Sequence, residues 1–330
     1  MKLSVLCQSP VRQGGTSEEA LAETVALAEH TDALGYSRFW VSEHHSTAAY
    51  AGSAPEVLLG AIGARTKAIR IGTGGIMLPH YSEFKVAEVA SVLATLFPDR
   101  VDIGFGRAIG AGMDTAQELA GGAPNRFHLF PQMVEGVVQK LANKRYRPKL
   151  FPRPEVDPAV WMLGTSQDSA ALAGQLGLPY NFALFINPDM HSDVVRHYEQ
   201  SFVASEHTPK PHSCLTVNVY CADTEEEAKQ IAKARHLSVL RVATGAGFSG
   251  IGTVEEAENY PYGGQELAYI KQRSRLDAIG TPEQVKAQLE GLKDMFGVDE
   301  IMTVTITYDF EARKRSYALL AEVMGLTPLA

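Results

Sequence analysis

Short β-rich segments alternate with helical patterns along the whole sequence, and this alternation limits the possible folds more than any other feature. Parallel strands need a crossover between them, usually a helix, so repeated strand–helix units predict a parallel sheet. Eight such strands fit one (β/α)₈ barrel, an α/β TIM-barrel domain spanning residues 1–330. A doubly wound open sheet is the alternative, although it usually has fewer strands and a Gly-rich first turn. The expected strands are residues 3–8, 38–45, 69–78, 101–106, 160–164, 180–185, 214–222 and 300–306.

One segment interrupts the alternation. Residues 245–280 are rich in glycine and contain the stretch NYPYGG, and we expect an insertion here that is helical in part around 266–273. No stretch resembles a linker, so the chain is expected to form a single domain. Further helices are expected from Thr16 to Leu34, and at 55–66, 126–141, 166–176, 188–204, 225–242, 281 onward and 309–324.

Composition excludes several classes of protein. Of 330 residues, 45% are hydrophobic and 21% charged, which is typical of a globular protein. The net charge of -8 disfavours nucleic-acid binding, which needs clustered Lys and Arg. No apolar run approaches the ~20 residues that span a bilayer. The N-terminal apolar stretch is too short for a signal peptide, and the three cysteines form no CxxC motif, so we expect a cytoplasmic protein with reduced thiols.

The end of the second expected strand carries Glu43, His44 and His45. Functional groups of a barrel lie at the carboxyl ends of its strands, and a histidine there can act as an acid or a base. A surface histidine or a helix-cap contact explains the triplet about equally well. A metal site is disfavoured, because adjacent strand residues point to opposite faces and the chain has no HExxH motif.

Two further strand ends carry candidate groups. Gly74 and Gly75 indicate a bulge or the close approach of a flat ligand, although a plain strand end explains them as well. Arg107 follows the fourth strand, where a guanidinium could bind phosphate or pair with a carboxylate, and Arg126 opens the next helix. The stretch GFGRAIG fails as a dinucleotide-binding motif, because Ile109 stands where the third glycine should be.

A fourth candidate lies where the fifth strand passes into a helix. Thr165, Ser166 and Ser169 could add hydroxyl donors to the free N–H groups of a helix N-terminus, which together favour an anion. An ordinary helix cap is the simpler interpretation, and Asp168 disfavours an anion unless it points away. A phosphate together with a flat ring over two glycines indicates a flavin mononucleotide without proving it.

Several segments, in this order and spacing, resemble the bacterial-luciferase-like flavin monooxygenases, and the resemblance covers almost the whole chain. It is closer to the non-luminescent members of that family than to the light-emitting luciferase. The segments are RFWVSEHHSTAAYAGSAPEVLL, IRIGTGGIMLPHYSEFKVAE, DRVDIGFGRA, GTSQDSAALAGQLGLP and IGTPEQVKAQL.

The resemblance implies a (β/α)₈ barrel with FMN at its mouth, and an active-site loop at 245–280. It implies a flavin ring over a cis peptide between Gly74 and Gly75. The other implied site residues are Arg107 and Arg126 on the phosphate, Ser166 and Ser169 with Thr165 beside them, and His44 at the reactive face of the flavin.

The resemblance also implies an activity. We expect a monooxygenase that uses reduced FMN, supplied by a separate NAD(P)H-flavin reductase, and O₂ to add one oxygen atom to a small organic substrate. His44 would act as donor or base, and Gln8, Glu43 and His45 would shape the substrate pocket. The alternatives are hydride transfer with the deazaflavin F420 on the same barrel, and a non-catalytic flavin-binding protein.

Two residues depart from the family, and a dimer is expected. Cys7 stands where many relatives have Asp, which should alter the pocket floor, and Gly106 stands where the luciferase catalytic subunit has Cys, so light emission is not expected. The resemblance implies a homodimer through the helix at 55–66. Small residues such as Gly60 and Gly63 would permit close helix approach there, or would simply pack against the barrel.

Overall fold

The strands close into a parallel barrel, as the alternation predicts. A computed structural model describes residues 1–108, 112–205, 208–246 and 250–329. The order β6-β5-β4-β3-β2-β1-β9-β7 closes because β6 also pairs with β7, and every pairing is parallel. The barrel strands are β1 (Lys2–Cys7), β2 (Arg38–Val41), β3 (Arg70–Met77), β4 (Val101–Gly106), β5 (Ala159–Gly164), β6 (Tyr180–Phe182), β7 (Ser213–Cys221) and β9 (Glu300–Val304).

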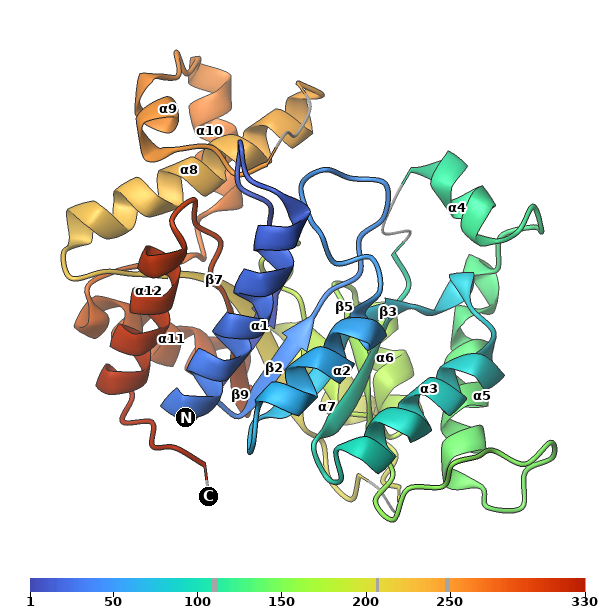
Figure 1. The fold of residues 1–330 in the computed structure, drawn as a ribbon. Helices are drawn as coiled ribbons and strands as arrows, with labels where there is room; N and C mark the ends of the chain where they lie inside the picture. The colour runs from blue at the N-terminus through green and yellow to red at the C-terminus, as the bar shows by residue number, and fades with distance from the viewer. Residues whose placement is uncertain (109–111, 206–207, 247–249, 330) are drawn as a thin grey trace.

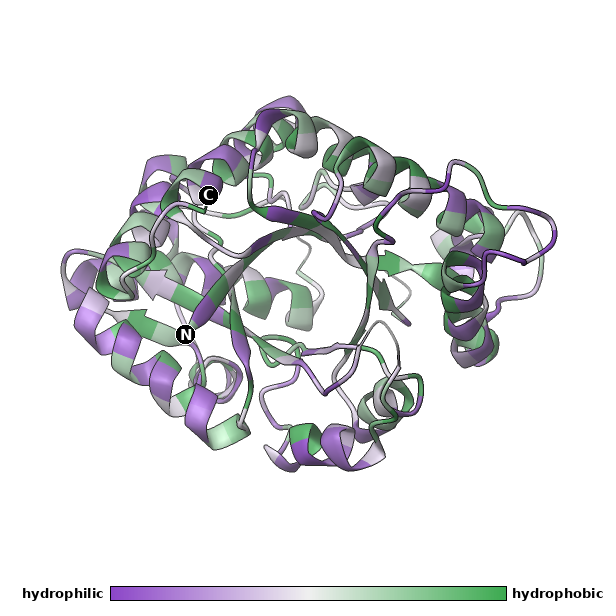
Figure 2. Ribbon diagram, turned by 90° about the horizontal axis from the view of Figure 1, so that it is seen from below, coloured by the Kyte–Doolittle hydropathy of each residue, from purple (hydrophilic) through white to green (hydrophobic). Residues whose placement is uncertain are grey.

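Helices surround the barrel, and Figure 2 shows the ring of strands inside them. None of the helices in the described residues has the length and apolar character needed to cross a membrane. The helices are α1 (Ser17–Leu34), α2 (Pro55–Arg65), α3 (Glu83–Leu96), α4 (Met113–Leu119), α5 (Phe130–Ala142), α6 (Gln167–Gln175), α7 (Asp193–Ser201), α8 (Glu225–Thr244), α9 (Val254–Asn259), α10 (Gly264–Arg273), α11 (Pro282–Phe296) and α12 (Phe310–Val323), with 3₁₀ turns at Leu78–His80 and Phe127–Leu129.

The structure differs from the expected elements in a few places. A ninth strand, β8 (Ala278–Gly280), stands last in the strand order and pairs with β7, and its three residues are too few to form a recognisable pattern. The second strand ends at Val41 rather than residue 45, so the histidines lie in the loop after it. The insertion contains the expected helix α10 and also α9, and both lie at the top of Figure 1, on the side of the barrel where α8 runs.

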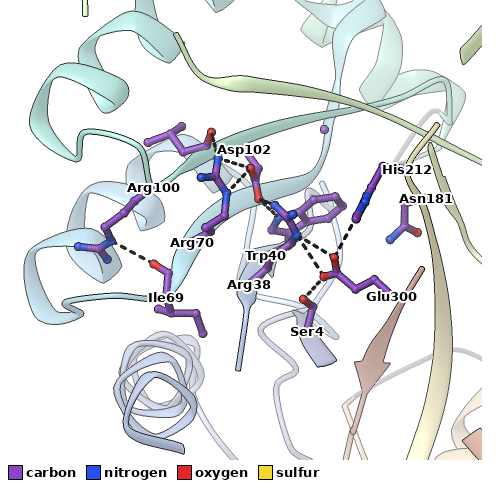
Figure 3. Close-up of polar contacts among 12 residues, drawn as sticks. Ser4, Arg38, Trp40, Ile69, Arg70, Arg100, Asp102, Asn181, His212 and Glu300 are labelled. Carbon is purple, nitrogen blue, oxygen red and sulfur yellow. Dashed lines mark hydrogen bonds and ion pairs between the residues drawn. The ribbon is translucent and has the colours of Figure 1, made fainter. Parts of the chain in front are cut away.

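The amino end of the barrel is filled by a buried ionic network (Figure 3). Asp102 is fully buried and accepts four hydrogen bonds: from Arg38 (2.7 Å), from Trp40 Nε1 (3.0 Å) and two from Arg70 (3.0 and 2.8 Å). Arg38 also bonds Glu300 across the barrel, at 3.1 and 3.2 Å. Because each charge has an oppositely charged partner, the network is held in one geometry.

Glu300 is the second buried carboxylate of this network. It accepts hydrogen bonds from Ser4, Arg38 and His212, and none of its surface is exposed. Burial by itself would raise the pKa of Glu300, but the charge of Arg38 and the bonds from His212 and Ser4 outweigh burial and lower it to about 2. Glu300 is therefore ionised at neutral pH.

Candidate active site

A cavity of about 450 Å³ opens at the carboxyl ends of β3, β4 and β5, and we call it the first cavity. This volume is within the ~300–1,000 Å³ of ordinary ligand pockets. Its walls are apolar on the barrel side and polar at the start of α6. The lining includes Leu6, Trp40, Gly74, Gly75, Met77, Gly106, Arg107, Leu163, Thr165, Ser166, Asp168, Ser169, Phe185, Ile186 and Met302.

The peptide bond between Gly74 and Gly75 is cis, as the resemblance implies. A Cβ at Gly74 would lie 2.6 Å from Leu6 Cδ1, and one at Gly75 would lie 2.5 Å from Leu163 Cδ1. Neither position has room for a side chain, so β3 presents bare backbone at this wall of the cavity. A flat ring can approach such a wall closely.

The polar end of the first cavity is built at the N-terminus of α6. Ser166 caps the helix: its Oγ accepts from Ser169 N at 3.3 Å, and Ser169 Oγ donates to the Ser166 carbonyl at 2.8 Å. The expected helix cap is therefore present, and the same two serines, with Thr165, also line the cavity. An exposed Asp168 lines it too, so a negative charge stands at the same helix end.

The two arginines expected at a phosphate have different surroundings. Arg107 is exposed, lines the first cavity and forms no hydrogen bond or ion pair with any of the described residues. Arg126 lies outside the lining of the first cavity, and its Nη2 donates to the carbonyl oxygens of Pro79 (3.1 Å) and Tyr81 (2.7 Å). Arg126 thus ties the start of α5 to the loop after β3, and Arg107 is the cation left available to a ligand.

A second cavity, of about 620 Å³, adjoins the first and shares Phe185 and Ile186 with it. Three predicted residues, Gln8, His44 and His45, line this second cavity rather than the first. Its other lining residues include Tyr50, Asn218, Arg235, His236, Val239, Val242, Ala243, Tyr269, Ile270, Arg273, Ser274 and Asp277.

His44 is held in the second cavity as a neutral imidazole. Its ring stacks on Tyr50 with centroids 4.4 Å apart, and its Nδ1 lies 3.2 Å from Ser42 Oγ. Burial, followed by the positive charges of Arg235 and His45, lowers the pKa of His44 to about 4. The ring is therefore uncharged near neutral pH, with one nitrogen that donates and one that accepts a hydrogen bond.

Glu43 lines neither cavity. It is 1% exposed and accepts three hydrogen bonds, from His45 Nε2 (2.6 Å), Met77 N (2.9 Å) and the Tyr81 hydroxyl (2.8 Å). Its carboxylate therefore fixes the position of His45 and joins the loop after β2 to the loop after β3. Among the described residues, no group of three His, Cys, Asp or Glu side chains has the arrangement of a metal site.

The expectation that Cys7 alters the pocket floor is wrong. Cys7 is fully buried outside both cavities, 3.6 Å from Thr24 Oγ1 of α1 and 3.4 Å from Arg313 Nη2 of α12. The side chain of a residue near a strand end can point outward between barrel and helices as well as inward. Gly106 does line the first cavity.

Sequence reasoning missed the polar residues on α8 and at the end of the insertion. Arg235 shares a helix face with Val239 and Val242, which also line the second cavity, so a cation within an apolar helical stripe was the available signal. Arg273 ends the expected helix of the insertion and Asp277 follows it, but a partly helical insertion does not indicate which of its side chains face the barrel. These three residues give the second cavity its charge.

The fold and site define a ligand-binding (β/α)₈ barrel with two adjoining cavities at its mouth. A family model for luciferase-like monooxygenases matches residues 1–300, and the chain belongs to that family. An uncharacterised Bacillus subtilis protein, YwcH, is 42% identical, with 98% of this chain and 99% of that protein covered. The N-acetyl-S-alkylcysteine monooxygenase of the same organism is 34% identical, with 98% of both chains covered.

Solved structures share the fold of this chain. The crystal structure of apo-MsnO8 superposes with a TM-score of 0.92 at 36% identity, covering 99% of this chain and 98% of that one. The oxygenating constituent of 3,6-diketocamphane monooxygenase from a Pseudomonas putida plasmid, in complex with FMN, has a TM-score of 0.71 at 18% identity, covering 99% and 98%. The latter likeness shows the shared fold alone. The oxygenase component of a flavin-dependent trigonelline monooxygenase from Acinetobacter baylyi is 24% identical, with 94% of this chain and 90% of that protein covered. With the family and such flavin-dependent relatives, the chain is a flavin monooxygenase.

Proposed function

We propose that this protein is an FMN-dependent monooxygenase that takes reduced FMN from a separate NAD(P)H-flavin reductase. The observation that carries the proposal is the first cavity, where bare backbone at Gly74 and Gly75 lies at one wall and Arg107 with the start of α6 at another. A relative described as the oxygenase component of a flavin-dependent monooxygenase supports a flavin cofactor and a separate reductase, and a barrel of the same fold has been solved in complex with FMN.

The residues of the first cavity fit FMN. Trp40, Leu163 and Met302 offer apolar contact to the flavin ring, and Arg107, Ser166 and Ser169 offer donors to the phosphate. When bound, reduced FMN would supply two electrons, so that one atom of O₂ goes to the substrate and the other leaves as water. The protein binds and orients the flavin and keeps water from the reacting atoms.

His44 is proposed as the proton-transfer residue for a substrate in the second cavity. Its Nδ1 faces Ser42 Oγ, so Nε2 is the ring atom that exchanges a proton. The low pKa of about 4 keeps this atom in its neutral form at the working pH. Gln8, whose buried Oε1 has no partner among the described residues, and His45 shape the same cavity.

The proposal is tested by titrating the full-length protein with FMN, reduced FMN and F420, and then measuring O₂-dependent substrate loss beside a flavin reductase. The thioether N-acetyl-S-benzylcysteine is the first substrate to try, because a relative is named for this class. We expect tight binding of FMN or its reduced form. Preference for F420 would instead indicate hydride transfer, and flavin binding without turnover of any substrate would indicate a flavin-binding protein.

His44→Ala should lower turnover about 100-fold or more, as expected for loss of a general acid or base, while the FMN dissociation constant stays unchanged. The matched control is His191→Ala, because His191 is 76% exposed and lies outside both cavities. Equal turnover in the two variants would remove His44 from the mechanism.

A homodimer through α2 is also proposed. Gly63 already packs within the chain, since a Cβ there would lie 2.5 Å from the Phe97 ring, but Gly60 has open space around it. Val57 on α2 and Leu96 on α3 are 69% and 62% exposed. Sedimentation at micromolar concentration should give twice the mass of the chain, and a monomer would contradict the proposal.

A further inference from the structure

The second cavity contains more positive than negative charge. Arg235 and Arg273 both line it, and among its described lining residues Asp277 is the one carboxylate. Both oxygens of Asp277 are engaged: Asn218 Nδ2 donates to Oδ1 at 2.9 Å, and His236 Nε2 lies 3.0 Å from Oδ2. Asp277 therefore has its own partners and forms an ion pair with neither arginine.

Arg235 projects from α8 toward His44. It forms a hydrogen bond with Tyr50, the residue on which His44 stacks, and its charge is felt by the His44 ring. None of the carboxylates in the described part of the chain lies within the 4.0 Å of an ion pair with it. The Asp277 carboxylate is near enough for its charge to favour the charged guanidinium, but it forms no ion pair with this half-buried group, whose donors can therefore reach a ligand.

Arg273, at the end of α10, is the second such cation. Its Nε is buried and has no hydrogen-bond partner in the described residues. The nearby Asp189 is bonded by Arg275 at 2.7 Å and by Gln272, so its carboxylate is already occupied. Two guanidinium groups from different helices thus line one cavity and have donors to spare.

Part of the lining of the second cavity is apolar. Val239, Val242 and Ile270 line it beside the arginines, and Phe185 and Ile186 form the boundary with the first cavity. A ligand that fits has an anionic end at the arginines and an apolar body extending toward the first cavity. The planar fork of a guanidinium matches a carboxylate in particular.

We propose that the second cavity binds the carboxylate of an organic acid through Arg235 and Arg273, and that the substrate of this enzyme belongs to that chemical class. The substrate assignment rests on the function proposed above. Anchoring the acid end beside Tyr50 and His44 orients the apolar end toward the first cavity, which is how one bound charge would select the atom that is oxygenated.

The test compares two acids with their primary amides: 4-phenylbutyrate, and N-acetyl-S-benzylcysteine. Binding to the full-length protein is measured by calorimetry, without reductase or turnover, in the wild type and in Arg235→Gln, Arg235→Lys and Arg273→Gln. Lys233→Gln is the matched control, since Lys233 is an exposed cation on the same helix outside the cavity. We expect at least one acid to bind about tenfold or more tightly than its amide.

Arg235→Gln should reduce that preference to less than about threefold, because the charge-assisted bonds are lost, whereas Lys233→Gln should preserve it. Arg235→Lys should retain part of the preference for the acid over its amide. If Arg235→Gln does not fold, Arg273→Gln and Arg235→Lys decide. Equal binding of acid and amide in both pairs, binding of neither, or equal losses in the Arg235 and Lys233 variants would overturn the proposal. FMN titration is independent of these measurements, so a failure here is distinguishable from failure of the proposed cofactor.

Discussion

The buried carboxylates at the amino end of the barrel and two arginines at its carboxyl end differ in whether they have partners. At the amino end, Asp102 and Glu300 are fully buried and each of their oxygens accepts hydrogen bonds from side chains opposite (Figure 3). At the carboxyl end, Arg107 and Arg273 form no ion pair with the described residues. Charges that are fully paired hold a structure together, whereas charges without partners are available to a ligand.

Trp40 connects the two ends. Its indole Nε1 donates to Asp102 at 3.0 Å, and its ring packs edge-on against Trp161 while also lining the first cavity. The position of this cavity wall therefore depends on the buried network beneath it. The comparison predicts that changes at the amino end alter stability, and that changes at the carboxyl end alter binding.

Asp102→Asn should give the largest effect. It removes the negative charge between Arg38 and Arg70 and should lower the free energy of unfolding by about 3–5 kcal/mol, as when one partner of a buried pair is lost. Urea unfolding of the variant and the wild type measures this loss of free energy. The control is Asp99→Asn, because Asp99 also pairs with Arg70 but is 81% exposed, and should cost less than about 1 kcal/mol. Similar losses in the two variants would remove the distinction between buried and exposed pairs.

The second prediction concerns acid pH. The folded-state pKa of Glu300 lies near 2, below its ordinary 4.5, so the unfolded chain binds the proton first as pH falls. The stabilisation is thus complete above about pH 5 and lost as pH falls toward 2; it amounts to roughly 3 kcal/mol, with about half left at pH 3. The stability difference between wild type and Glu300→Gln, measured by urea unfolding from pH 7 to 3, should shrink accordingly. A stability difference between the two proteins that does not change with pH would contradict this role of Glu300.

The fold could be predicted because its signals are local. Each barrel strand is a β-rich run ended by a turn or a capped helix, and the capping box of Thr16 and Glu19 forms as expected. β8 and α9 escaped prediction because a three-residue strand and a six-residue helix carry too little pattern. Their positions depend on packing against β7 and α8 rather than on their own residues.

The site could be predicted only in part. Gly74 and Gly75 lie in the second half of β3, and Arg107 and the start of α6 follow β4 and β5; all strands of a parallel barrel end at one mouth. The position of a residue at the barrel mouth does not determine which of the two cavities His44 lines, nor which atoms a long side chain contacts. Thus Arg126 bonds backbone carbonyls, and Arg235 enters the second cavity from a helix.

Arg107→Ala tests the carboxyl end directly. Losing a charge-assisted contact to phosphate should weaken FMN binding about 10- to 100-fold, while urea unfolding without FMN changes little because Arg107 is exposed and pairs with no described residue. Fluorescence titration gives the dissociation constant. Arg145→Ala, which removes an exposed arginine outside both cavities, is the control. An unchanged constant in Arg107→Ala would refute the role of Arg107 on the phosphate.

Asp168→Asn should have the smallest effect and the opposite sign. The exposed Asp168 carboxylate stands at the N-terminus of α6 and lines the first cavity, where it repels a bound phosphate even as it favours the helix dipole. Removing its charge should tighten FMN binding about two- to fivefold and slightly lower the free energy of unfolding. Both effects are small because solvent screens exposed charges. The gain should fall as salt is raised. The control is Glu155→Gln, an exposed carboxylate that lines neither cavity. Weaker FMN binding in Asp168→Asn would instead mean that this carboxylate helps to hold the ligand, and the carboxyl end of the barrel could not then be described by its unpaired cations alone.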